Sequence, residues 1–146
     1  MKNSVKYRNR LAVIQESYEN LLKGLKMFKM RVDNVDSINS LGTELTYNSF
    51  DYLGKGYGKV YPESLDKMKE NEIPNYISDT IIDIDHLESY FLETKANLLR
   101  YKGKEGVSDL IGNINSLIFD YNSYISILKK FISEIESEEE FLWWMY

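Results

Sequence analysis

The chain has 146 residues, of which 43% are hydrophobic and 28% charged, and its formal net charge is -5. This length suits a single domain over residues 1–146, and the apolar share supports a core and argues against a disordered chain. Because cysteine is absent, disulfides, thiolate metal sites and a cysteine nucleophile are excluded.

The chain also lacks the apolar segments that direct proteins into or across membranes. No apolar run approaches the roughly 18–20 residues of a membrane span, so no transmembrane segment is predicted. No apolar signal-peptide region follows the polar start of the sequence. We therefore expect a protein that is cytoplasmic or is exported without a cleaved signal peptide.

The first predicted element is a helix over about residues 3–40. Its apolar and aromatic residues recur at alternating spacings of three and four, which is the heptad pattern of a helix packed along another helix. They are Leu11, Ile14, Tyr18, Leu21, Leu25, Phe28, Val32 and Val35. Residues 1–31 also carry eight Lys and Arg against two Glu, so this helix is basic although the whole chain is acidic.

A glycine-rich bend is predicted next, over residues 42–61. Gly54, Gly56 and Gly58 are each separated by one residue. This spacing matches neither a Walker loop nor a dinucleotide-binding fingerprint, and no apolar strand precedes it. The pattern instead indicates a tight crossing at which small residues allow two helices to approach each other.

Three further helices complete the predicted chain. A short helix over about 62–71 begins at Pro62, because proline is tolerated in the first turn of a helix. A kink or short turn at 71–74 separates it from a helix over about 75–102, because the residue before Pro74 is disfavoured in the helical region. A turn with Gly103 and Gly106 leads to a long helix over about 107–145. There the heptad positions are Val107, Leu110, Ile114, Leu117, Tyr121, Tyr124, Leu128, Phe131, Ile135, Glu138, Leu142 and Met145, and all but Glu138 are apolar or aromatic.

These elements predict an all-α fold. With two very long helices and one glycine-rich bend, we expect an elongated antiparallel helical bundle, or coiled-coil hairpin. Tyr18, Tyr121 and Tyr124 are expected at the edge of its core with their hydroxyls in water.

No catalytic, metal or cofactor site is predicted. His86 is the only histidine, and Asp83 lies one helical turn before it. One histidine cannot supply the paired Glu-x-x-His motifs of a di-iron bundle, and a Ser-His-Asp triad would lack a serine in a nucleophile elbow. We therefore expect a protein that is not an enzyme.

The end of the chain holds the residues that we select as candidates for an interaction. An acidic run is followed by consecutive large apolar residues, and exposed apolar patches typically mark interfaces. The candidates are Glu134, Glu138, Glu139, Glu140, Phe141, Leu142, Trp143 and Trp144. The acidic run also complements the basic first helix, within one molecule or between two.

The bend carries a motif with a known counterpart: Tyr52, Leu53, Gly54, Lys55, Gly56 and Tyr57. Together with Glu72-Ile73-Pro74 and the order of long helices, it resembles the N-terminal helical domain of the LXG proteins. These are relatives of the WXG100 family, which the type VII secretion system of Gram-positive bacteria exports. The resemblance implies a hydrophobic-x-Gly turn between long helices and a complex with a small helical partner.

The sequence departs from that family in two respects. Tyr52 stands where a Trp-x-Gly motif has tryptophan, and the sequence from Tyr47 to Asp51 that matches the Tyr-x-x-x-Asp/Glu export tag lies inside the bend. We also expect no toxin domain after the helices. The resemblance therefore implies a stand-alone partner or accessory protein.

Two functions follow from these observations. The first is a non-enzymatic helical interaction protein that binds another helical protein or associates with itself. The alternative is a small acidic inhibitor, such as an immunity or phage anti-defence protein, that binds its target through the acidic run. Nucleic-acid binding is not predicted, because the chain as a whole is acidic.

Overall fold

The structure is a computed structural model that describes residues 2–33 and 51–145, with side chains described as far as Glu138 in the last helix. All of the secondary structure in these residues is helical, which confirms the all-α prediction. The predicted end of the first helix and residues 42–50 of the bend, with Tyr47, lie outside the described residues.

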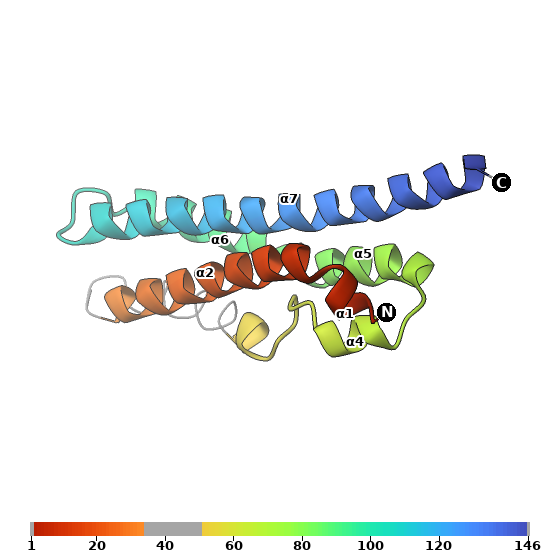
Figure 1. Ribbon diagram of the computed structural model, residues 1–146. Helices are drawn as coiled ribbons and strands as arrows, with labels where there is room; N and C mark the ends of the chain where they lie inside the picture. The colour runs from red at the N-terminus through yellow and green to blue at the C-terminus, as the bar shows by residue number, and fades with distance from the viewer. Residues whose placement is uncertain (1, 34–50, 146) are drawn as a thin grey trace.

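The longest helix is α7, which forms one side of the molecule, and α2 runs along it in the opposite direction (Figure 1). Helices α5 and α6 also pack against α7, and α1 contacts α4 beside the start of α2. The elements are α1 (Asn3–Lys6), α2 (Arg8–Val32), α4 (Pro62–Asp66), the 3-10 helix η2 (Glu70–Glu72), α5 (Ile73–Asp83), α6 (His86–Leu99) and α7 (Val107–Met145). Residues 51–54 are also helical.

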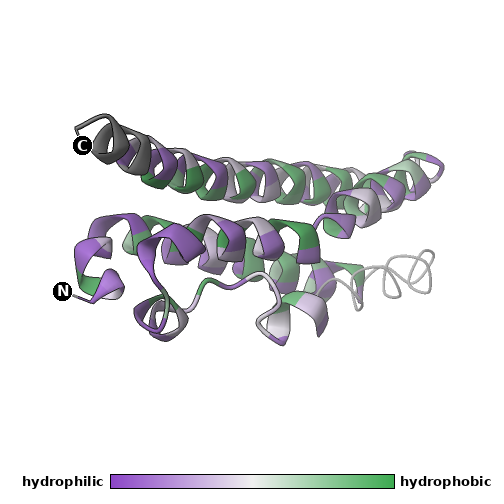
Figure 2. Ribbon diagram, turned by 90° about the vertical axis from the view of Figure 1, so that its right-hand side faces the viewer, coloured by the Kyte–Doolittle hydropathy of each residue, from purple (hydrophilic) through white to green (hydrophobic). Residues whose placement is uncertain are grey.

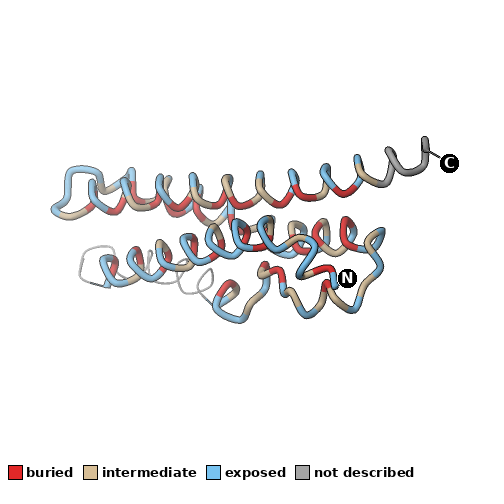
Figure 3. Tube along the Cα trace, in the orientation of Figure 1, coloured by how far each residue is buried: buried red, intermediate tan, exposed pale blue. Residues whose placement is uncertain are grey.

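The core lies along the seam between α7 and the helices beneath it, where the buried residues face one another (Figure 3). The apolar residues turn toward the same seam in Figure 2. Tyr7 packs edge-on against Phe131, with ring centroids 5.2 Å apart. Heptad residues of α2 and α7 from Leu11 to Val32 and from Val107 to Ile135 are all buried, as their spacing predicts.

The first predicted helix is not continuous at its start. It breaks at Tyr7, whose φ of -104° and ψ of 24° separate α1 from α2. The break turns α1 toward α4, where the Asn3 amide donates hydrogen bonds to the carbonyls of Leu65 and Met68 at 2.7 and 2.8 Å. On the same side, Asp66 accepts bonds from both the backbone and the hydroxyl of Ser4. These contacts fix the short helix α1 in place.

The predicted helix over 75–102 is also wrong as a single element. It starts earlier, at Ile73, and it breaks at Ile84 and Asp85 into α5 and α6. At the break, the carbonyl of Ile84 accepts a hydrogen bond of 3.1 Å from the hydroxyl of Tyr121 in addition to one from the backbone N–H of Leu87. Likewise, the predicted helix over 62–71 is two elements, α4 and η2.

In the part of the chain that the structure describes, no helix combines the length and the apolar character needed to cross a membrane.

Candidate interaction surface

The predicted bend motif serves the interior of the fold. Leu53 is buried, and its carbonyl accepts a hydrogen bond from the Tyr18 hydroxyl of α2. The carbonyl of Gly58 accepts one from the Tyr124 hydroxyl of α7. Because the motif region is bonded from both long helices, it positions the bend within the fold.

Glycine is required at Gly58 for two reasons. Its φ of 107° lies in the left-handed region that side chains disfavour. A Cβ placed there would also lie 2.6 Å from Cγ2 of Ile84, so the bend approaches the α5–α6 break closely. The close approach is thus between the turn at Gly58 and the α5–α6 break, whereas the glycine spacing predicts a crossing of two helices.

The other motif side chains lie nearer the surface. The ring centroids of Tyr52 and Tyr57 are 4.8 Å apart. Lys55 pairs with Asp51, with 3.1 Å between Nζ and Oδ2, so Asp51 of the tag-like sequence is engaged locally. Gly54 is exposed at the end of its helical turn.

The tyrosines at heptad positions differ from the prediction. Tyr18, Tyr121 and Tyr124 are buried, and each hydroxyl donates to a backbone carbonyl where we expect it to face water. Burial raises the pKa of Tyr18 and of Tyr121 to about 12, and that of Tyr124 further. These hydroxyls therefore act as neutral donors that satisfy the bend and the α5–α6 break.

His86 lies at the start of α6 among aromatic rings. Its ring centroid is 4.2 Å from that of Tyr52 and 5.3 Å from that of Tyr90, and its Nδ1 is 4.0 Å from a carboxylate oxygen of Asp85. Within residues 2–33 and 51–145, no three His, Cys, Asp or Glu side chains are grouped so that they could hold a metal ion. The surroundings of His86 are those of a packed aromatic cluster.

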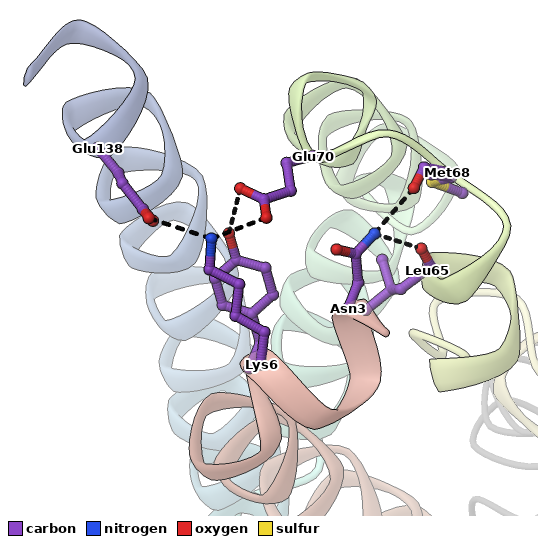
Figure 4. Close-up of polar contacts among 7 residues, drawn as sticks. Asn3, Lys6, Leu65, Met68, Glu70 and Glu138 are labelled. Atoms are coloured by element: carbon purple, nitrogen blue, oxygen red, sulfur yellow. Dashed lines mark hydrogen bonds and ion pairs between the residues drawn. The ribbon is translucent and has the colours of Figure 1, made fainter. Parts of the chain in front are cut away.

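Two of the acidic candidates pair with the basic start of the same chain. Glu134 accepts hydrogen bonds from Arg10. The ammonium of Lys6 lies between Glu70 of η2, at 2.7 Å, and Glu138 of α7, at 3.1 Å (Figure 4). The hydrogen bond to Glu70 is the main reason that the pKa of Lys6 is raised.

These ion pairs show where the predicted complement of the acidic run lies. The basic and acidic helices complement each other within one molecule at Glu134 and Glu138. The side chains of Glu139, Glu140, Phe141, Leu142, Trp143 and Trp144 lie outside those that the structure describes, although the helix α7 extends to Met145.

A groove between α2 and α7 is a surface that the sequence pattern does not predict. It has a volume of about 270 Å³, and α2 and α7 each supply four of its residues: Val13, Glu16, Ser17, Asn20, Phe119, Asp120, Ser123 and Ile127. Phe119 is 71% exposed and Val13 is 43% exposed. Its lining is mixed, with three apolar residues (Val13, Phe119 and Ile127) and five polar or charged ones. Apolar anchor positions are what a helix contacts when it docks in a groove.

The groove also contains a carboxylate in a partly apolar setting. Burial raises the pKa of Asp120, because desolvation disfavours the charged form. One sequence signal points to this groove: Phe119 is a large aromatic residue outside the heptad positions of α7, beside the polar residues Ser116 and Asn122.

Comparisons of the chain with protein-family models, with curated proteins and with solved structures find no match.

Proposed function

We propose that this protein is a non-enzymatic helical interaction protein that binds another helical protein. The observation that carries the proposal is the groove between α2 and α7, with Phe119 exposed on its rim. An amphipathic helix that lies in such a groove buries apolar residues of both partners. In this proposal α2 and α7 form an elongated, coiled-coil-like hairpin that presents the groove.

The resemblance to LXG and WXG100-like proteins adds a context to this proposal. The protein would be a stand-alone partner or accessory in type VII secretion. Leu53 and Gly54 close the helical residues 51–54, directly before a turn, and in this proposal that turn corresponds to the hydrophobic-x-Gly turn of the family. The bonds from Tyr18 and Tyr124 hold the bend and give the hairpin a fixed shape.

Co-expression with the products of neighbouring genes tests the proposal. We expect a complex that size-exclusion chromatography with light scattering detects, and that Phe119→Asp weakens at least tenfold because it places a charge in the groove. Leu92→Asp is the matched control, since Leu92 is an exposed apolar residue on α6. Equal effects of the two variants would remove the groove from the proposal, and the lack of any complex would refute the proposed function.

The alternative, a small acidic inhibitor, receives less support from the structure. Glu134 and Glu138 already pair with Arg10 and Lys6, so less of the acidic charge is available to a basic target. A salt-sensitive complex with a basic enzyme that is lost when Glu136, Glu139 and Glu140 are reversed in charge would favour this alternative.

A further inference from the structure

On the outer face of α2, the residues before Asn20 are matched by similar or oppositely charged residues at nearly the same distances after it. Val13 and Met27, 43% and 40% exposed, lie seven residues on either side of Asn20. Glu16 lies four residues before Asn20 and Lys23 three residues after it. All five residues are exposed at helical spacings, so they share one face of α2.

The charges on this face have no partner in the described chain. Neither Glu16 nor Lys23 forms an ion pair with any described residue, whereas Lys6 and Arg10 on the same side of the sequence do. An acid and a base at nearly equal distances from Asn20 are arranged to pair across an antiparallel contact. Val13 and Met27 are both apolar and lie at equal distances from Asn20, so they would face each other in the same contact.

The ion pairs that α1 and α2 make with α7 follow the register of antiparallel helices. A step of four residues forward, from Lys6 to Arg10, corresponds to a step of four back, from Glu138 to Glu134. The same rule applied to two copies of α2, with Asn20 opposite Asn20, places Val13 opposite Met27. It also places Glu16 within one residue of Lys23 of the second copy.

We propose that the groove between α2 and α7 is covered by a second copy of this chain. A twofold axis passes beside Asn20, so the two α2 helices run antiparallel and each pair of contacts occurs twice, as in any isologous dimer. Phe119 and Asp120 of α7 form the adjoining wall of the groove. This inference rests on the proposed function, and it identifies the helical partner as a second copy of the chain.

Charge reversal in the purified full-length chain tests the proposed dimer, with sedimentation velocity as the measurement. Glu16→Lys or Lys23→Glu alone creates two like-charge contacts per dimer. We expect each to raise the dimer dissociation constant by about tenfold or more. The double variant restores the opposite charges, so we expect it to regain most of the affinity. An equimolar mixture of the two single variants should form a mixed dimer for the same reason.

A control variant and two contrary results complete the test. Glu93→Lys, an exposed residue of α6, changes the net charge as Glu16→Lys does and should leave the dimer intact. A wild-type chain that remains a monomer at high concentration would overturn the inference. So would a double variant, or a mixture of single variants, that fails to recover the dimer.

The inference and the proposed function can fail separately. A monomeric chain that still binds a neighbouring gene product, and loses it with Phe119→Asp, would refute the dimer and support the function. A dimer with charge-swap rescue and no foreign partner would support the inference and refute a function in binding a different protein.

Discussion

At the scale of single residues, three buried tyrosines connect α2 and α7 to backbone carbonyls elsewhere in the fold. Tyr18, Tyr121 and Tyr124 donate hydrogen bonds to the carbonyls of Leu53, Ile84 and Gly58, and the first two of these carbonyls also accept backbone N–H groups. Their burial follows from the heptad spacing, but their hydrogen-bond partners do not. The Tyr124 hydroxyl and the Gly58 carbonyl are 66 residues apart, so only the tertiary structure brings them together.

Tyr124→Phe tests this role at the most buried of the three hydroxyls. The variant keeps the ring and leaves the Gly58 carbonyl without its donor, which should lower the free energy of unfolding by about 1–3 kcal/mol. Urea denaturation followed by circular dichroism measures the difference. Tyr57→Phe is the control, because Tyr57 is exposed and its variant should stay within about 0.5 kcal/mol of the wild type. Equal losses of stability in Tyr124→Phe and Tyr57→Phe would contradict this role of the Tyr124 hydroxyl.

Asp66 gives a residue-scale prediction about pH. The backbone N–H and then the hydroxyl of Ser4 lower the pKa of this carboxyl from 3.8. Its folded pKa is therefore below its unfolded value. Its stabilising contribution is present above about pH 3.8 and is lost as the pH falls through the folded pKa. We expect Asp66→Asn to be less stable than the wild type at pH 7 and to approach it at acidic pH. A stability difference that does not change with pH would contradict this account.

At the scale of elements, the heptad pattern predicts which residues are buried but not where the helices break. A spacing of three and four continues through Tyr7 and through Ile84, since both breaks leave apolar residues in phase with the seam. The breaks occur where Asn3 bonds to α4 and where Tyr121 bonds to Ile84, and the spacing does not reveal these long-range contacts. The groove escapes prediction for a similar reason: it forms between two helices, and its main residue, Phe119, lies outside either heptad.

Alanine substitutions at two glycines in helix interiors distinguish the effect of helix propensity from the effect of packing. A Cβ added at Gly112 would have no atom within 4 Å, so Gly112→Ala should raise the free energy of unfolding by about 1 kcal/mol. At Gly24 the added Cβ would lie 2.9 Å from Cδ2 of Leu117. Gly24→Ala should therefore gain less than Gly112→Ala, because Leu117 must shift. Thermal or urea unfolding of the two variants gives the comparison, and a larger gain at Gly24 would show that the seam has room.

At the scale of the whole molecule, α7 is the element on which the fold is assembled. Helices α2, α5 and α6 and the 3-10 helix η2 all contact it. Near its acidic end, Lys6 and Arg10 connect it to the start of the chain. The charge asymmetry of the sequence is thus used inside the molecule there.

Lys6 of α1 pairs with η2 and α7 at this end of the molecule, and Lys6→Met would remove the positive charge that links them. Its ammonium bonds to Glu70 and Glu138 at the surface, and surface ion pairs contribute only about 0–1 kcal/mol each. We therefore expect a small loss of global stability. The larger effect should be local, because the loss of Lys6 removes the link between η2 and the last turns of α7. Hydrogen exchange should become faster at the backbone amides near Glu70 and Glu138, while amides in the middle of α7 keep their protection.

Lys26→Met is the control, since Lys26 is exposed on α2 and makes no ion pair with any described residue. Unchanged exchange at both sites in Lys6→Met would mean that apolar packing alone, through Tyr7 and Phe131, holds this end of α7.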